Sequence, residues 1–237
     1  MTVHRLDETD STNLEARAGA PGDVFVAEFQ RAGRGRLGHS WHAARGENLT
    51  FSAVLGCDGR PPSEVATLPL VVGLAVAKGL QSPYGRARFA VKWPNDVMAG
   101  GRKVAGILCE LHGDSVIAGI GLNVNQTRFP PEIADRATSL AVLEGRSLDR
   151  DKVLAEVLSS LEARHAEWLR GGFAALHGEL AELDCLRGAY VSVRQTDGDL
   201  EPVSGICGGI AEDGTLLVGG RRVFAGEAHV DKMLTSR

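Results

Sequence analysis

Apolar and polar positions along the chain predict an ordered succession of strands and helices. In residues 48–55, Leu49, Phe51, Ala53 and Leu55 occupy every second position, which predicts a strand with one buried face. Apolar runs bounded by turn-forming residues predict further strands at 24–29, 89–91, 104–111 and 115–123.

Three segments have the signals of helices. Thr12 precedes Glu15 by three residues, a capping box that marks either a simple helix start or a polar binding corner. A second helix begins at the cap Ser63, ends near Leu80 and covers the sheet with one apolar stripe. This stripe consists of Val65, Leu68, Val72 and Val76. A long amphipathic helix over 147–169, stopped by two glycines, is a packing element.

The pattern of apolar residues changes near Leu186, from long helical segments to short strands. Short β segments follow at 190–194, 205–207, 216–218 and 222–224. Asp197-Gly198 and Asp213-Gly214 supply turns between them. These short strands predict a small separate barrel.

Composition and charge are those of an ordinary globular chain. The 237 residues are 43% hydrophobic and 24% charged, and the formal net charge of −4 argues against a nucleic-acid surface. The N-terminus has no apolar signal core, and the apolar stretch 68–77 is stopped by Lys78, well short of the roughly 20 residues that a membrane span needs. We therefore expect no membrane association and a cytoplasmic location.

Four cysteines, at positions 57, 109, 185 and 207, have no metal-binding spacing and lie in apolar runs. They are expected to be buried free thiols, which suits a reducing compartment.

Residues 90–111 combine charged side chains with strong turn signals. Between the two predicted strands lie Lys92-Trp93-Pro94-Asn95-Asp96 and the pair Gly100-Gly101, which predict a hairpin. Pro94 keeps Trp93 out of helical conformation, so the neighbouring side chains are held on a stiff corner. The hairpin is expected to bring Lys92 and Lys103 close together.

A second charged stretch, Gly33-Arg34-Gly35-Arg36-Leu37-Gly38, follows the strand at 24–29. It matches G-x-G-x-x-G, but the residues after it are polar and irregular, which argues against a dinucleotide loop. A protein-kinase interpretation of Phe89-Ala-Val-Lys92 fails because no H-R-D or D-F-G follows. Alternating Gly and Arg can wrap an anion and bind its oxygens bidentately, or form only an exposed turn.

The strand at 115–123 ends in Gly119-Ile-Gly121-Leu-Asn123-Val-Asn125. Small residues there allow a ligand to approach the backbone, and the two amides supply donors and acceptors.

Three motifs together resemble those of biotin protein ligases, in order and in spacing. They are Ser11-Thr12-Asn13, the run Gln30-x-x-Gly33-Arg34-Gly35-Arg36-x-Gly38, and Lys92-Trp93-Pro94-Asn95-Asp96 followed by Arg102-Lys103-x-x-Gly106. The resemblance covers the whole chain. It implies an α+β fold, with a mixed sheet backed by helices in a catalytic domain over 1–185, and an SH3-like barrel over 186–237.

Two departures from the family pattern stand out. Leu37 and His39 lie where some relatives carry further arginines, so the loop is less basic here. Relatives that repress transcription carry an N-terminal winged helix-turn-helix, and here the motif region begins at residue 10, which leads us to expect no DNA binding.

The resemblance also implies the reaction. Biotin would attack the α-phosphorus of Mg²⁺·ATP to give biotinyl-5′-AMP and pyrophosphate. A lysine of the biotin carboxyl carrier domain of a biotin-dependent carboxylase would then take the biotinyl group. The sequence leaves open whether the protein is a monomer or a homodimer.

The family's site residues carry over to matching positions of this chain. Lys103 would act on the carboxylate and α-phosphate, together with Arg34 and Arg36 from the loop. The expected biotin-binding residues are Ser11, Thr12, Asn13, Gln30, Gly33, Arg34, Arg36, Trp41, Lys103 and Gly106. The expected nucleotide-binding residues are Arg34, Arg36, Lys92, Asn95, Lys103 and Asn123. Trp93 is either an apolar wall or a core residue.

Asp96 has three possible roles: base for the incoming lysine, metal ligand, or partner of Lys92. A base role is slightly favoured, and no other metal ligand is assigned. The nearest rival function is a lipoate- or octanoate-transferring enzyme, and the rival of another class is a non-catalytic biotin sensor. A sensor is disfavoured because Lys103 and both loop arginines are present.

Overall fold

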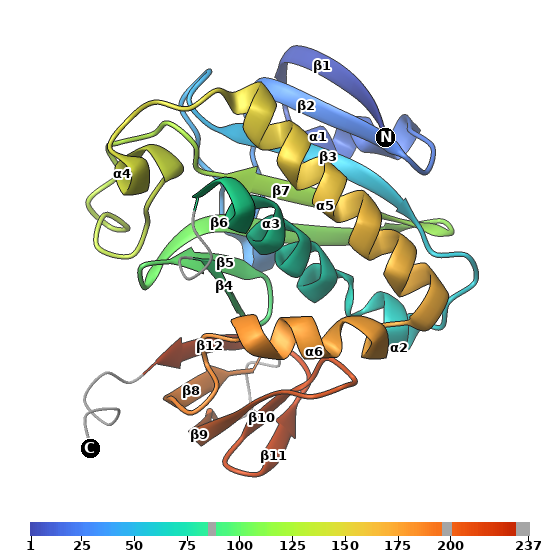
Figure 1. Ribbon diagram of the computed structural model, residues 1–237, viewed down its shortest axis with the longest axis vertical. Coiled ribbons are helices and arrows are strands. Elements are labelled where there is room, and N and C mark those ends of the chain that lie inside the picture. The colour runs from blue at the N-terminus through green and yellow to red at the C-terminus, as the bar shows by residue number, and fades with distance from the viewer. Residues whose placement is uncertain (85–88, 196–200, 231–237) are drawn as a thin grey trace.

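The computed structural model describes residues 1–84, 89–195 and 201–230. They form two sheets joined by one hydrophobic core (Figure 1). The strands of the larger sheet are β1 (Thr2–Thr9), β2 (Asp23–Gln30), β3 (Leu49–Gly56), β4 (Phe89–Lys92), β5 (Asp96–Ala99), β6 (Arg102–His112) and β7 (Ser115–Leu122). The helices are α1 (Thr12–Glu15), α2 (Pro62–Val65), α3 (Leu68–Tyr84), α4 (Leu140–Glu144), α5 (Arg150–Gly171) and α6 (Ala174–Leu183).

The larger sheet is mixed, as expected. Its strand order is β1-β2-β3-β7-β6-β5-β4, with β1 parallel to β2 and every other pair antiparallel. The edge strand β1 was not predicted, because six of its eight residues are exposed and no alternation marks it.

Strand β3 differs from its prediction, because both of its faces are buried rather than one. The apolar positions face the core, whereas the alternate positions Thr50 and Ser52 lie beneath the short helix α1, where Ser52 contacts Thr12 and Asn13. The polar face of this strand is therefore a layer of the interior.

Helices α3 and α5 lie across one face of the sheet (Figure 1). The helix predicted from Ser63 is broken after Val65, begins at cap Pro61, and continues as α3 to Tyr84. Of the predicted stripe, Leu68, Val72 and Val76 are buried and Val65 is partly buried. Burial of α3 extends beyond this stripe. The long packing helix is also confirmed, although it starts later, with Asp149 as its cap.

The predicted hairpin over 90–111 is wrong in one respect. An additional strand, β5, lies between β4 and β6 and pairs with both, so the segment is a three-stranded meander. The sequence pattern did not predict strand β5, because it is only four residues long and follows two turn-forming residues.

The second sheet is antiparallel and lies beyond α6 (Figure 1). Its strands, in the order β11-β10-β9-β8-β12, are β8 (Tyr190–Arg194), β9 (Val203–Ile210), β10 (Leu216–Val218), β11 (Arg221–Val223) and β12 (Glu227–Val230). This sheet is consistent with the expected SH3-like domain. Strand β12 was not predicted, and the predicted Asp197-Gly198 turn lies outside the described residues. The boundary at residue 185 stays a prediction.

The cysteine prediction holds for two of the four residues. All four thiols are free, but only Cys57 and Cys207 are buried. Cys109 is half-buried and Cys185 is exposed, because Cys185 lies in the surface link between α6 and β8. Burial raises the pKa of the Cys109 thiol to about 12.

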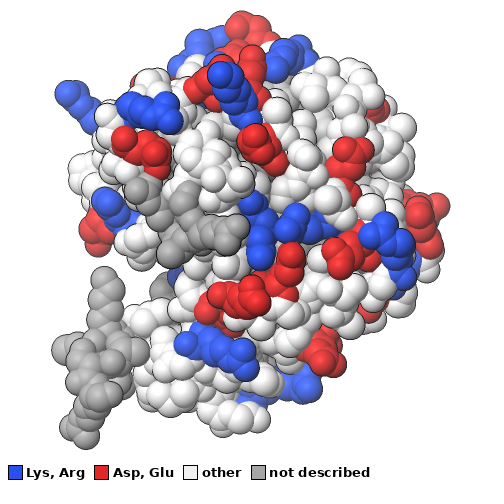
Figure 2. All heavy atoms as spheres, in the orientation of Figure 1, with Lys and Arg blue, Asp and Glu red and all other residues white. Residues whose placement is uncertain are grey.

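Among the described residues, one helical stretch, Pro62–Tyr84, has the length and apolar character of a membrane span, and its most apolar window is 67% buried inside the protein. Its burial against the sheet explains that composition. Acidic and basic side chains are interspersed over the face drawn in Figure 2.

Close packing of α3 on α5 depends on Gly79. A Cβ atom there would lie 2.9 Å from the carbonyl oxygen of Glu156 and 3.0 Å from the Cα of Val157. We predict that Gly79→Ala lowers the free energy of unfolding by about 1–3 kcal/mol, because overpacking outweighs the gain in helix propensity. Urea denaturation measures it.

Gly178 in α6 is the matched control, because a Cβ there meets nothing within 4 Å. Gly178→Ala should stabilise the protein by about 0.5–1 kcal/mol. Equal effects of the two substitutions would contradict the packing explanation.

Candidate active site

A cavity of about 620 Å³ lies on the sheet face opposite α3, between the sheet, the loop 33–41 and strand β12. Successive residues of a strand point to opposite faces of the sheet, and this alternation separates the cavity from the core. On β6 the Ile107 side chain approaches α3 beside Gly73, whereas the neighbouring Gly106 faces the cavity. The cavity lining includes Ser11, Thr12, Asn13, Gln30, Arg34, Arg36, Trp41, Lys92, Asn95, Asp96, Lys103, Gly106 and Asn123. Of the expected site residues, only Gly33 is not part of this lining, and it lines the adjacent smaller cavity instead.

The floor of the cavity is bare backbone. Gly106 on β6 and Gly121 on β7 are direct cross-strand partners. The indole of Trp41 lies on this floor, since a Cβ at Gly121 would be 2.2 Å from its Cε2 atom. The Nζ atom of Lys103 lies 5.9 Å from the centre of the same ring. The indole Nε1 is buried with no hydrogen-bond partner among the described residues.

One end of the cavity is a polar pocket built on α1, β2 and β3. The Gln30 side-chain oxygen accepts from the Thr12 backbone N–H at 2.8 Å and from its hydroxyl at 3.1 Å. The Ser52 hydroxyl lies 2.7 Å from Thr12 Oγ1 and donates to Asn13 Oδ1 at 2.6 Å. Ser11, Thr12 and Asn13 are all buried, so their polar atoms are fixed before a ligand arrives.

The capping box predicted at this corner does not form. Ser11 occupies the cap position without a side-chain cap bond, and Glu15 instead accepts from the Thr9 hydroxyl at 2.6 Å. The corner is therefore held by contacts with the sheet and not by a helix cap.

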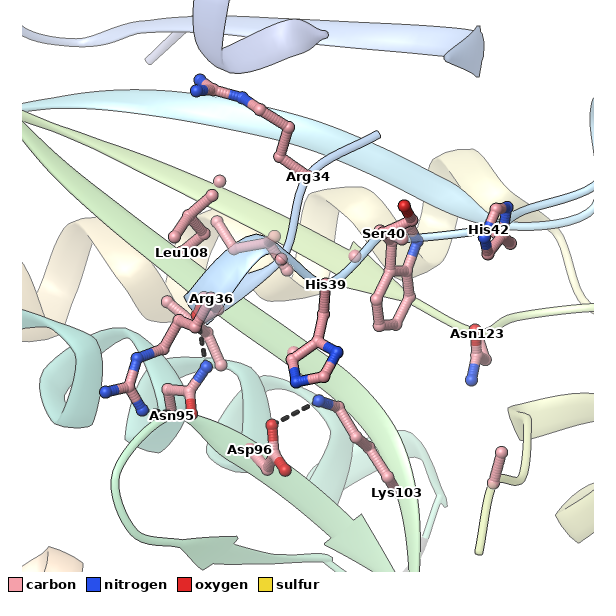
Figure 3. Close-up of a pocket in the computed structure, with 18 of the residues that line it drawn as sticks. Arg34, Arg36, His39, Ser40, His42, Asn95, Asp96, Lys103, Leu108 and Asn123 are labelled. Carbon is pink, nitrogen blue, oxygen red and sulfur yellow. Dashed lines mark hydrogen bonds and ion pairs between the residues drawn. The ribbon is translucent and has the colours of Figure 1, made fainter. Parts of the chain in front are cut away.

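Lys103 and Asp96 form an ion pair at the centre of the cavity, with 2.5 Å between Nζ and Oδ1 (Figure 3). The partner of Asp96 is thus Lys103, which differs from the predicted alternative of Lys92. The backbone of Lys103 is also fixed, because its N–H donates to Arg136 O at 2.7 Å and its carbonyl accepts from Thr138 N at 2.9 Å. A rigid backbone and a close carboxylate hold this ammonium group in place.

The two loop arginines point in different directions (Figure 3). Arg34 donates to Glu110 Oε2 at 2.8 Å, and Glu110 also accepts from Asn13 Nδ2 at 2.6 Å. Arg36 leaves the loop on the side of Asn95 and donates to Asn95 Oδ1 at 3.2 Å. Arg34 therefore ties the loop to β6, while Arg36 reaches toward Asn95.

The two expected nucleotide amides have different environments. Both polar atoms of the Asn95 side chain have hydrogen-bond partners, because its Nδ2 donates to Ile107 O at 2.7 Å and its Oδ1 accepts from Arg36. Asn123 donates to Thr138 O at 3.0 Å and lines the far end of the cavity. Asn95 is thus placed to position Arg36, whereas Asn123 is placed for a ligand.

Sequence reasoning missed several residues that support the site. Ser52 and Glu110 lie inside apolar runs, and a polar residue in such a run is the signal that would have identified them. Glu227 and His229 of β12 also line the cavity, and no sequence signal connected that segment with the site.

Within the described residues no group of three or more His, Cys, Asp or Glu side chains could hold a metal ion. Asp96 is the carboxylate nearest to Lys103 and is paired with it.

Known proteins share this architecture. The Biotin/lipoate A/B protein ligase family matches residues 4–126. A biotin--[acetyl-CoA-carboxylase] ligase of Mycobacterium tuberculosis is 36% identical, over 94% of this chain and 86% of that protein. A bifunctional ligase/repressor BirA of Bacillus subtilis is 37% identical over 72% of this chain, which spans 55% of the length of that relative.

A solved structure of biotin protein ligase from Aquifex aeolicus in complex with biotin and ATP superimposes with a TM-score of 0.85 at 33% identity, covering 97% of this chain and 98% of that one. The fold and the cavity thus define the class of the biotin protein ligases, with their mixed sheet and second antiparallel sheet. The chain belongs to the biotin/lipoate A/B protein ligase family.

Ser52 provides a test of the polar pocket. We predict that Ser52→Ala lowers the free energy of unfolding by about 1–3 kcal/mol, because the buried Asn13 oxygen loses its donor. The substitution should also weaken the binding of any ligand that contacts the Thr12 hydroxyl, because Ser52 holds that hydroxyl in place. Ser192→Ala is the control, since within the part of the chain that the structure describes its hydroxyl bonds only to that of exposed Ser204. An unchanged unfolding midpoint for Ser52→Ala would contradict the assigned bond.

Proposed function

We propose that the protein activates biotin with ATP as biotinyl-5′-AMP and transfers the biotinyl group to a lysine of a carrier protein. The observation that carries this proposal is the continuity of the cavity: the polar pocket at Thr12, the Lys103–Asp96 pair and Asn123 line one space. A ligand with a polar ring, a chain ending in a carboxylate, and a nucleotide would span these three regions in that order.

The polar pocket would receive the ureido ring of biotin. Ser11, Thr12 and Gln30 offer fixed donors and acceptors, and the aliphatic chain would run beside the indole of Trp41, which lies on the glycine floor of the cavity. The carboxylate would then reach Lys103.

In the first step, a carboxylate oxygen of biotin attacks the α-phosphorus of ATP and pyrophosphate leaves. Lys103 and Arg36 stabilise the charge that develops on the phosphate oxygens. Mg²⁺ enters with the nucleotide as part of the substrate and neutralises its phosphates. Asn123 and Lys92 are assigned to the nucleotide.

In the second step, the amine of the carrier lysine attacks the acyl carbon of the mixed anhydride and AMP leaves. We assign Asp96 to accept the proton that the amine loses, because it lies at the reacting centre beside Lys103. The carrier is assigned to the biotin carboxyl carrier domain of a biotin-dependent carboxylase, which the name of the Mycobacterium tuberculosis relative supports. We further propose a cytoplasmic enzyme, monomeric or homodimeric, that does not bind nucleic acid.

The choice of biotin over lipoate or octanoate rests on the polar pocket, since octanoate has no ring and lipoate no ureido group to satisfy it. ATP–pyrophosphate exchange should depend on biotin and not on lipoate or octanoate. Exchange supported equally by octanoate would overturn the assignment.

Lys103→Ala tests the central role of the ammonium group. We predict that exchange falls about 10²–10³-fold while the Kd for biotin changes by less than about tenfold, because Lys103 acts on charge that develops in the transition state. Isothermal titration and exchange kinetics measure the two quantities.

Two further variants sharpen this test. Lys152→Ala, at an exposed position of α5, should leave both quantities unchanged. Lys103→Ala with Asp96→Asn removes the orphaned carboxylate. Recovery of the exchange rate in this double variant would show that the single substitution acted through Asp96, contrary to the assignment.

A further inference from the structure

The loop 33–41 contacts the second sheet as well as the first. Arg36 Nη1 donates to the carbonyl oxygen of Gly226 at 3.5 Å, a contact between residues 190 positions apart. His39 Nε2 lies 3.7 Å from Glu227 Oε1, and this contact is an ion pair when the imidazole is protonated. Both partners lie at the start of β12, which forms one wall of the cavity.

The second sheet is firmly attached to the first. Trp93 Nε1 donates to Gly214 O at 3.1 Å, so this buried tryptophan of the Lys-Trp-Pro-Asn-Asp motif docks the second sheet and also contributes to the lining of the cavity. Asp184 accepts from Ile210 N at 3.1 Å, and His177 bonds to Ile210 O at 2.7 Å. Side chains of both sheets belong to one core. Strand β12 is therefore a fixed support.

The backbone at this support requires glycine. Gly226 has a φ of +152°, and a Cβ there would lie 2.5 Å from the carbonyl oxygen of Arg194 on β8. This conformation presents the Gly226 carbonyl to Arg36 and places Glu227 next to it.

The loop is strained on its own side. Leu37 has a φ of 53° and Gly38 a φ of 78°, directly before His39. A left-handed leucine is unfavourable, and Leu37 is 57% exposed, so its own packing offsets little of that cost. Contacts at Arg36 and His39, on either side of the strained Leu37, oppose the opening of the loop.

We propose that Glu227 and His39 form a clasp by which the C-terminal sheet holds the loop 33–41 closed over the cavity. The clasp is independent of ligand. Under the proposed function it also slows the escape of biotinyl-5′-AMP, because the loop covers the reacting centre. From the sequence, His39 was expected only to make the loop less basic, because it stands where some relatives carry arginine. In the structure, His39 has Glu227 as its partner.

Hydrogen–deuterium exchange of the ligand-free protein tests the clasp without reference to any activity. Glu227→Gln and His39→Ala should each raise exchange of the amides in residues 33–41 by about two- to fivefold, the range expected for an exposed ion pair. The double variant should exchange no faster than the faster single one, because both substitutions remove one contact. His39→Arg should keep the loop as protected as in the unaltered protein.

Glu212→Gln is the matched control, because Glu212 is exposed on the same sheet and does not line the cavity. It should leave loop exchange unchanged. Both clasp residues are partly exposed, so thermal unfolding midpoints near that of the unaltered protein will exclude misfolding. Unchanged exchange in Glu227→Gln, or additive effects in the double variant, would refute the clasp.

A second measurement tests the consequence for the intermediate. Preformed biotinyl-5′-AMP should leave Glu227→Gln about two- to fivefold faster than it leaves the unaltered protein or Glu212→Gln. Faster loop exchange without faster release would overturn the retention role. If the unaltered protein forms no adenylate at all, the proposed function fails, and the exchange experiment still decides whether the clasp exists.

Discussion

The site depends on a strip of sheet surface that carries no side chains. Gly106 and Gly121 face each other across β6 and β7, and Trp41 lies directly on them. The next residues on the same strands, Ile107 and Ile120, are buried in the core on the other face. Alternation along two strands thus gives one densely packed face that fixes the backbone and one bare face that admits a ligand. A side chain at Gly121 would occupy the space of the indole.

Most of the sheet and the two long helices were predictable, because their apolar residues recur with the period of the element. The elements that escaped prediction lack this signal. Strand β1 is an exposed edge, and β5 is too short to show a period. The polar residues Thr50 and Ser52 made β3 look half-exposed, although they support the polar pocket from within.

Most of the residues that line the cavity were predictable from motifs, but their pairing was not. A register shift between Val97 and Met98 sets Asp96 opposite Gly106 and Met98 opposite Lys103. Such a bulge has no fixed sequence signature, and it turns Lys103 onto the sheet face of Asp96. The two side chains pair there, although Lys92 is the cross-strand neighbour of Asp96 on β4. Contacts across 190 residues, such as Arg36 with Gly226, depend on how two sheets dock, which local patterns cannot encode.

Three cationic side chains of the cavity, Lys103, Arg34 and Arg36, have partners of different charge. This difference decides how strongly each of them gains from contact with an anionic ligand. Lys103 and Arg34 already have carboxylate partners, so a ligand oxygen must compete with an ion pair. Among the described residues, Arg36 bonds to an amide and a carbonyl oxygen, both neutral. Exchanging a neutral acceptor for a phosphate or carboxylate oxygen strengthens its hydrogen bonds, so Arg36 gains more from a charged ligand than Arg34 or Lys103 does. Arg36 is thus better placed than Arg34 or Lys103 to respond to the charge of a ligand, because no existing ion pair opposes the new contact.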